Sequence, residues 1–516
     1  MKLRTTGRWL LLTLGLGLVA WPGLSAEKAT RDVLTVASGT RWATPCYVQD
    51  SGAAGPTVVV VAGLHGDEPA GVWAADEIRH WPIQRGRLML LPRANVPALQ
   101  ANSHYLPGID KSRGNLNGEF AHPTQSEWSD DSPAQALWQT VAAAKPDWLV
   151  DLHEGSDFRR RQPHNIGSSI GKSGTARVRL AAEVMLAAVN TTINGDDQKF
   201  VVSGSPASGS LARAARERFQ AQTLVLATTS QDQPLALRIR QHRVMLHALL
   251  EHLGLIDSRV SVDLISGDAT DRSSLRMAVY AGPGTRKGMH HLIREMEQLP
   301  DATVVPLGAE EIDAGALEHF QVVVFPGGSS TKQGAALGEV NRHKVQEFVQ
   351  RGGGYVGICA GAYLATTEFP WSLQILDAKP CSAEKYRGQG MVAMELTPAG
   401  RKILGTDQRW CDVRYHNGPI LMRAQRADLP DFQPLAVFRS EVAESGVSEG
   451  IMVGAPAIVA GRYGKGRVVC FSPHPDQTRG LEELVRRGIR WAADGDRPER
   501  LTGVESQAPK KPAAAS

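Results

Sequence analysis

The sequence predicts two consecutive three-layer α/β domains. Its 516 residues exceed the usual size of a single domain. Strand patterns alternate with helical patterns in the first half, and a second such series starts after a polar stretch at 256–275. A hydrophobic content of 42% with 21% charged residues is typical of a folded globular protein. The net charge of +4 is small and scattered, so we expect no nucleic-acid partner.

The first series contains the run TVVVVAG at 57–63, which is typical of a strand buried on both faces. Ser132 is placed to cap a helix that begins at Pro133. Further strands are predicted at 86–93, 147–152 and 223–226, and helices at 133–144, 176–189 and 235–253. This alternation favours a mainly parallel sheet covered on both faces, and we assign the first domain to 31–255.

A second domain is expected at 276–495, after a linker at 256–275. Its strands are predicted at 277–280, 321–325, 354–358 and 468–471, with helices at 288–298 and at 345–351. The periodicity ends near residue 497, so we expect a disordered tail at 497–516.

The first 26 residues have the layout of a secretory signal peptide. Lys2, Arg4 and Arg8 precede an apolar run at 9–19, and the segment LSA at 24–26 offers small residues for cleavage. An uncleaved membrane anchor is the alternative, but the run is shorter than the roughly 20 residues that span a bilayer. We therefore expect a periplasmic or secreted protein, with no stable membrane span after cleavage.

A candidate metal site combines the ends of two predicted strands. His65 and Glu68 follow the strand at 57–63, and His153 directly follows the strand at 147–152. Ligands of open α/β sheets bind beyond the carboxyl ends of the strands, so we expect the three side chains to converge. Two imidazoles and a carboxylate are a common donor set for catalytic zinc, which keeps a position for water. The alternative is a solvated loop and a hydrogen-bonded strand end.

Three motifs, HGDEPAG, NLNGEF and DLHEG, resemble the succinylglutamate desuccinylase/aspartoacylase family, a branch of the zinc carboxypeptidase superfamily. The resemblance covers about residues 33–255. It implies a zinc-carboxypeptidase-like fold in which His65, Glu68 and His153 hold Zn²⁺. It also implies an enzyme that cleaves N-acyl amino acids or C-terminal peptide bonds.

The sequence departs from this family at a substrate-binding position. Asn117 is kept, but Gly118 stands where the family has an arginine that grips the substrate carboxylate. Bidentate binding of a carboxylate requires a guanidinium. Arg113, or Arg159 in the run at 159–161, could replace it, and a solvated basic loop is the alternative.

A second departure concerns the general base. The family uses a glutamate on a late strand, and Ala227 stands at the matching position. Loss of a general base typically lowers the rate by roughly 10²–10⁴-fold. Glu154 and Asp232 are the nearby acids that could replace it. Metal binding does not need this base, so the departure bears on catalysis alone.

The second domain carries a candidate thiol site. The predicted strand at 354–358 leads through the pattern G-x-C-x-G to Cys359 and a helix, as in a nucleophile elbow. His474 follows a late strand as the expected base, and Asp476 is the expected partner of its ring. The glycines at 327–328 are expected to supply amides that bind an oxyanion.

The segments VVVFPGGSS and GICAGAYLA resemble the class I glutamine amidotransferase-like fold, which is flavodoxin-like. Within it they are most similar to the N-terminal domain of biotin–protein ligases, and the resemblance spans about 276–494. The alternative for Cys359 is a buried, inert side chain. Five cysteines are few and odd in number, so we expect no disulfide framework.

Together these patterns predict an exported zinc-dependent hydrolase that cleaves an amide bond in a small peptide or N-acyl amino acid. The amidotransferase-like domain is fused to it. One alternative is a metal-containing binding protein with weak or no catalysis, which Gly118 and Ala227 favour. Another is a thiol amidase that depends on Cys359, with the zinc domain as a docking module. The oligomeric state is left open.

Overall fold

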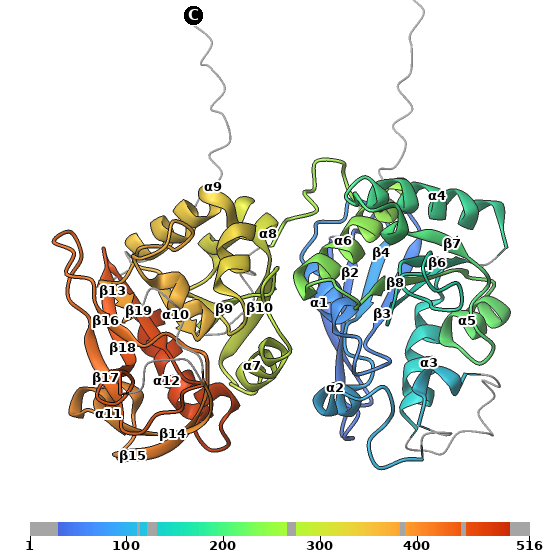
Figure 1. Cartoon of the computed structure of the whole chain (residues 1–516). Helices are drawn as coiled ribbons and strands as arrows, with labels where there is room; N and C mark the ends of the chain where they lie inside the picture. The colour runs from blue at the N-terminus through green and yellow to red at the C-terminus, as the bar shows by residue number, and fades with distance from the viewer. Residues whose placement is uncertain are drawn as a thin grey trace, which may run out of the picture.

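The computed structural model describes residues 29–110, 114–120, 132–172, 174–265, 275–381, 388–444 and 450–495. The predicted signal peptide, the predicted tail, Arg113 and residues 266–274 of the predicted linker lie outside these ranges. No helix in the described ranges is long and apolar enough to cross a membrane. The described chain forms two large sheets with helices on both faces (Figure 1).

The first sheet has eight strands in the order β1-β2-β4-β3-β5-β8-β6-β7. Its centre, β4-β3-β5-β8, is parallel, whereas β2 joins β4 and β6 joins β8 in antiparallel fashion. The predicted central strands are therefore present, and antiparallel edges make the sheet mixed. The strands are β1 (Thr30–Val36), β2 (Thr44–Asp50), β3 (Thr57–Ala62), β4 (Arg87–Leu91), β5 (Trp148–Gly155), β6 (Ser169–Lys172), β7 (Val201–Ser203) and β8 (Gln222–Thr229).

Helices cover both faces of this sheet because alternate strand residues are apolar on both sides. In β3, Val58 and Val60 pack with one helical layer, and Val59 and Val61 with the other. The predicted cap is present, since Ser132 accepts a hydrogen bond from an N–H in the first turn of its helix. One layer is α1 (Pro69–Ile78), α4 (Ala176–Asn190) and α6 (Leu235–His252); the other contains α3 (Pro133–Ala144) and α5 (Leu211–Phe219); the short α2 (Val96–Ala101) follows β4.

The second sheet has nine strands in the order β10-β9-β11-β12-β19-β18-β17-β14-β15. The run from β10 to β19 is parallel, and the run from β19 to β15 is antiparallel. A small separate sheet pairs β13 with β16. The strands are β9 (Leu275–Tyr280), β10 (Ala302–Leu307), β11 (Val322–Phe325), β12 (Gly354–Ile358), β13 (Ala378–Pro380), β14 (Gln389–Leu396), β15 (Trp410–His416), β16 (Leu421–Arg423), β17 (Gln433–Phe438), β18 (Pro456–Tyr463) and β19 (Gly466–Phe471).

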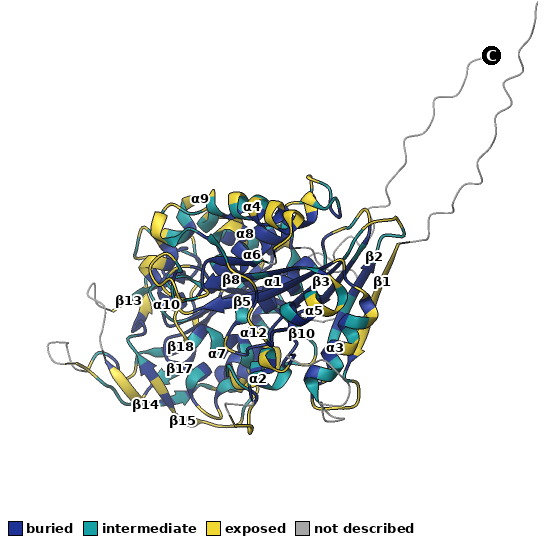
Figure 2. Cartoon of the chain, turned by 90° about the vertical axis from the view of Figure 1, so that its right-hand side faces the viewer, coloured by how far each residue is buried: buried dark blue, intermediate teal, exposed yellow. Residues whose placement is uncertain are grey.

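The centre of the second sheet is also enclosed by two helical layers, and β9, β11 and β12 are fully buried. The edge strands β14 and β15 carry exposed residues, which are yellow in Figure 2. One layer is α7 (Gly288–Glu297), α11 (Pro398–Leu404) and α12 (Glu482–Ala493). The other is α8 (Ala309–Asp313), α9 (Ser330–Gln350) and α10 (Ala360–Ala365).

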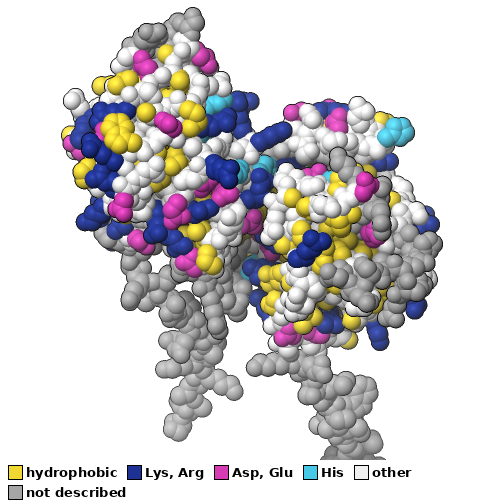
Figure 3. All heavy atoms as spheres, turned by 90° about the horizontal axis from the view of Figure 1, so that it is seen from below, with side chains coloured by type: hydrophobic (Ala, Val, Ile, Leu, Met, Phe, Trp, Pro, Cys, Tyr) yellow, Lys and Arg dark blue, Asp and Glu magenta, His cyan; other side chains and the backbone are white. Residues whose placement is uncertain are grey.

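The two domains share a buried core. One cluster of buried apolar residues runs from α1 and α6 into α7 and β9. At its side, the fully buried Arg243 of α6 pairs with Glu77 of α1, with Asp263 at 3.1 Å and with Glu311 of α8 at 2.6 Å. Burial raises the pKa of Glu77 to about 7 against the opposing effect of Arg243. Figure 3 shows charged and histidine side chains gathered along the seam between the two halves.

This network predicts that Arg243→Met destabilises the protein, because Glu77 and Glu311 would stay buried without their cation. The expected loss is about 3–5 kcal/mol. It is measured as a shift of the urea unfolding transition of the full chain. Arg240→Met, on the same helix, removes a more exposed pair with Asp263 and should cost less than about 1 kcal/mol. Equal losses in the two variants would contradict the importance of the buried network.

Candidate functional site

The three predicted ligands meet at the carboxyl edge of the first sheet. His65 follows β3, Glu68 is the N-cap residue of α1, and His153 lies in β5. The strands β3 and β5 are parallel neighbours, so their carboxyl ends present side chains at the same edge. All three side chains are buried, with exposed fractions between 3% and 7%. The strand β5 runs past His153 to Gly155, because it stays paired with β8.

One carboxylate joins the two imidazoles. Oε1 of Glu68 lies 2.9 Å from Nδ1 of His65, and Oε2 lies 2.8 Å from Nδ1 of His153. Burial alone would raise the pKa of Glu68, but His153 and His65 hold it well below its usual range. Burial alone would lower the pKa of His153, but Asp151 and Glu68 raise it well above its usual range. Both histidines thus turn the same ring nitrogen toward one ionised carboxylate.

The groups behind His153 fit the environment of a metal ligand. Its Nε2 lies 3.0 Å from Oδ2 of Asp151 and 3.1 Å from Nδ2 of Asn117. Asp151 is fully buried, so its carboxylate faces this ring nitrogen away from bulk water. If Nδ1 binds a metal, the ring proton sits on Nε2 and can be donated to Asp151. This donor set, two imidazoles and a carboxylate with an orienting acid, fits Zn²⁺.

Sequence reasoning missed two residues of this site. His104, after α2, stacks on His65 with the ring centroids 3.7 Å apart. Its Nδ1 lies 3.1 Å from Oδ1 of Asp67, and this hydrogen bond raises the pKa of His104. The segment around His104 carries no motif, so only the tertiary fold reveals it. Asp151 could have been found, because residues two apart in a strand point to the same face.

The predicted substrate-binding residues are placed differently. Asn117 is engaged at both ends, since its Nδ2 contacts His153 and its Oδ1 accepts the N–H of Leu211 at 3.0 Å. Arg159 is half-buried beyond β5, and its Nη1 donates to the carbonyl of Asn165 at 2.8 Å. A Cβ on Gly118 would meet no atom closer than 3.9 Å, so space does not require glycine where the family has arginine.

Both carboxylate oxygens of Glu154, the candidate general base, already have partners. Its Oε1 accepts the N–H of Ala70 at 2.7 Å, and its Oε2 pairs with Arg238. A carboxylate that is buried and ion-paired is poorly placed to take a proton from water at the metal. Asp232 lies exposed on the loop after β8. Ala227 is buried and lies opposite His153 in the β5–β8 pairing.

Cys359 occupies a strained turn in the second domain. It follows β12 and precedes α10, and its φ of +51° lies in the left-handed region. Two residues further on, the backbone at Gly361 passes so close to β11 that only glycine fits, since a Cβ on Gly361 would lie 2.1 Å from the carbonyl oxygen of Phe325. The thiol donates to the carbonyl oxygen of His416 at 3.4 Å. These features match the strand–turn–helix geometry of a nucleophile elbow.

His474 and Asp476 lie beside this turn. Nδ1 of His474 lies 3.2 Å from Oδ1 of Asp476. Burial alone would lower the pKa of His474, but the Cys359 sulfur and Asp476 raise it to about 10. A Cβ on Gly327 would lie 2.7 Å from Cε1 of His474 and 3.7 Å from Cβ of Cys359, so this glycine lines the gap between them. The structure therefore brings the predicted thiol, base and orienting acid together.

Both resemblances seen in the motifs are found by comparison with known families. Residues 54–253 match the succinylglutamate desuccinylase/aspartoacylase catalytic domain. Residues 275–378 match the N-terminal domain of biotin–protein ligase. Among solved structures, the tripeptide-bound cell shape determinant Csd4 of Helicobacter pylori is similar, with 16% identity and a TM-score of 0.37, over 49% of this chain and 66% of that chain.

Two curated proteins are similar over shorter stretches. An N-alpha-acetyl-L-2,4-diaminobutyric acid deacetylase of Halomonas elongata is 31% identical over 105 residues, 20% of this chain and 29% of that protein. A biotin–protein ligase of Schizosaccharomyces pombe is 33% identical over 99 residues, 18% of this chain and 15% of that protein. The chain thus spans less than a third of either relative. It joins a segment that matches the succinylglutamate desuccinylase/aspartoacylase family to a segment that matches the N-terminal domain of biotin–protein ligases.

Proposed function

We propose that this protein is an exported zinc-dependent hydrolase that cleaves an amide bond in a small peptide or an N-acyl amino acid. The observation that carries the proposal is the buried meeting of two Nδ1 atoms on the Glu68 carboxylate, at 2.9 and 2.8 Å. The match of residues 54–253 to a family of desuccinylases and aspartoacylases supports hydrolysis of an amide. The pattern of residues 1–26 supports a periplasmic or secreted location.

In this proposal His65, Glu68 and His153 hold the metal. Bound zinc supplies a Lewis acid that polarises a carbonyl and lowers the pKa of water to about 7. Asp151 fixes the proton of the His153 ring on Nε2. The burial of Asp151 and His153 keeps bulk water from competing for their contact.

His104 gives the site a polar group on its exposed side. Its side chain is 33% exposed, and Asp67 holds its Nδ1. Asp67 raises the pKa of His104, and when protonated the ring can hold a negatively charged oxygen of the substrate. Arg159, on the loop after β5, is the remaining candidate for a substrate carboxylate.

The alternative function is a metal-containing binding protein without catalysis, which the lack of a free carboxylate at the expected base position favours. Ala227 lies beside His153 where a carboxylate is expected, and Glu154 is occupied by Arg238. Metal would still bind, because none of the three ligands depends on that base.

The zinc proposal predicts zinc in the purified mature protein and turnover of at least one member of a panel of N-acyl amino acids and short peptides. His65→Ala removes one of three ligands, so both zinc content and turnover should fall to background, as should turnover with a chelator. His164→Ala, an exposed histidine on the loop after β5, is the control and should change neither. Zinc without any turnover would favour the binding protein, and turnover that survives His65→Ala would contradict the proposal.

A thiol amidase at Cys359 is a second candidate function, which the φ of +51° and the His474 pairing favour. The Cys359 sulfur would attack the amide carbonyl, and the protonated His474 would give its proton to the leaving amine. Water would then cleave the thioester, releasing the acid and restoring the thiol. Asp476 would keep the His474 ring oriented.

This candidate predicts that iodoacetamide alkylates Cys359 readily at neutral pH, because a raised pKa favours a protonated His474 ring, which would stabilise the thiolate. His474→Gln should slow that reaction about tenfold or more, and the exposed His343→Gln should not. Peptide mass spectrometry follows each cysteine separately. Cys46 serves as an internal reference, since burial raises its thiol pKa to about 12. An unchanged rate in His474→Gln would instead favour an inert Cys359.

A further inference from the structure

A buried ion pair lies directly behind the metal ligands. Arg238, in the first turn of α6, pairs with Glu154, the residue that follows the ligand His153. The exposed fractions of Arg238 and Glu154 are 5% and 6%. Burying two charges costs much of what their attraction returns, and losing one partner is strongly destabilising. A buried pair of this kind is therefore better explained by the groups that it positions than by its own stability.

Glu154 links this pair to the ligand Glu68. Its Oε1 accepts the N–H of Ala70 at 2.7 Å, in the first turn of α1. Glu68 is the N-cap residue of α1, and its own side chain makes no capping hydrogen bond. Glu154 therefore supplies the acceptor that this helix terminus needs. The backbone N–H of Glu154 also donates to Oε2 of Glu68 at 3.0 Å. One residue thus fixes both the helix start and the ligand carboxylate.

The second domain covers the turn of α6 that carries Arg238. The N–H of Ala236 donates to the carbonyl of Ala281 at 3.1 Å. A Cβ on Gly308 would lie 3.1 Å from the Cβ of Ala236, so the two domains approach closely here. Burial and the charge of Arg238 together lower the pKa of His290 of α7 to about 4. Without these contacts the first turn of α6 would face water.

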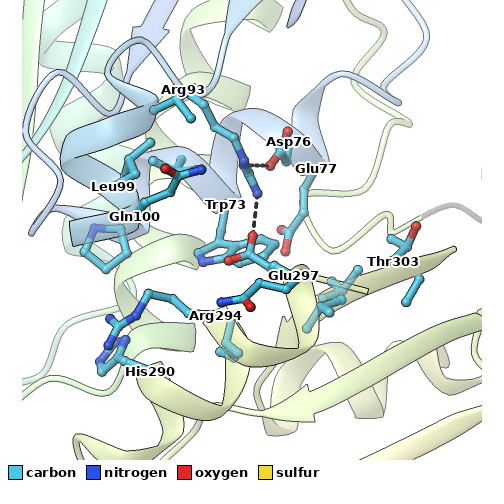
Figure 4. Close-up of a pocket in the computed structure, with 18 of the residues that line it drawn as sticks. Trp73, Asp76, Glu77, Arg93, Leu99, Gln100, His290, Arg294, Glu297 and Thr303 are labelled. Atoms are coloured by element: carbon cyan, nitrogen blue, oxygen red, sulfur yellow. Dashed lines mark hydrogen bonds and ion pairs between the residues drawn. The ribbon is translucent and has the colours of Figure 1, made fainter. Parts of the chain in front are cut away.

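A groove of about 980 Å³ runs between the domains beside this contact. Figure 4 shows side chains of α1 and α2 on one wall and of α7 and β10 on the other. Two pairs cross it, Arg93–Glu297 at 2.9 Å and Arg294–Asn102 at 3.2 Å. Both have solvent access and contribute little to holding the domains together. The close contacts of α6 are therefore the ones that tie the second domain to the metal site.

We propose that the second domain is a structural part of the metal centre and raises its affinity for zinc. It excludes water from the first turn of α6 and so keeps Arg238 paired with Glu154. That pair holds Glu68 and the start of α1 in the geometry that binds the metal. Arg238 and Glu154 are positioning residues, since they act through Glu68. The inference rests on the proposed zinc site and gives the fused domain a role in it.

Zinc affinity of the full chain, measured by competition with a chromophoric chelator, tests this inference. Arg238→Met should weaken zinc binding about 10–100-fold, the range for groups that orient metal ligands. Arg238→Lys should recover most of the affinity, because it restores the charge. Arg240→Met removes a charge from the same helix and should leave the affinity unchanged. The visible spectrum of the cobalt-substituted protein should change in Arg238→Met and not in Arg240→Met, since it reports ligand geometry.

A second arm tests the domain contact itself. Gly308→Val presses a larger side chain against Ala236 and should also weaken zinc binding, whereas Ala314→Val, after the same short helix and exposed, should not. If circular dichroism shows that Arg238→Met does not fold, Glu154→Gln replaces it, because it keeps an oxygen for the amide of Ala70. Unchanged zinc affinity in the folded ion-pair variant, or in Gly308→Val, would overturn the inference. Absence of zinc from the wild-type protein would contradict the proposed function instead.

Discussion

The buried carboxylate of Glu68 is the interaction on which the metal site depends. It joins the carboxyl ends of β3 and β5 by contacting His65 and His153, and Glu68 is also the N-cap residue of α1. Burial strengthens such contacts, and it makes each missing partner costly. Each ligand therefore has a partner behind it. Asn115 lies behind His65, Asp151 lies behind His153, and the backbone of Glu154 donates to Glu68.

The helix α6 connects the residues behind the metal ligands to the second domain. It packs on the first sheet, and its buried Arg238 and Arg243 pair with acids from β5, α1 and α8. The helix α7 connects the two candidate sites in a second way. Its Arg294 contacts Asn102 of the first domain, and a Cβ on Gly288 at its other end would lie 2.5 Å from Nε2 of Gln477 beside His474. The domains are thus joined through elements that also serve the sites.

The central strands could be predicted because their residues are apolar on both faces, as in the run from Val58 to Val61. The edge strands gave no such signal. The strand β7 has three half-buried residues, and β14 begins with exposed ones, so neither shows a clear apolar pattern. Antiparallel edges were missed for the same reason.

The metal ligands could be predicted because each lies near the end of a recognisable strand. Asp151 was within reach of the same reasoning through strand alternation. His104 was not, because its stacking on His65 depends on the loop after α2. The position of Glu154 next to His153 makes it a candidate base in the sequence. Its partner Arg238 is 84 residues away in sequence, and such a long-range pair leaves no local pattern.

X-ray absorption at the zinc edge of the purified protein tests the central claim most directly. The account predicts bound zinc with two imidazole nitrogens at about 2.0–2.1 Å, with oxygen ligands and no sulfur. His65→Ala should remove this signal. Zinc with a sulfur ligand at about 2.3 Å would place the metal on a cysteine and contradict the account. Absence of zinc from the protein would contradict it as well.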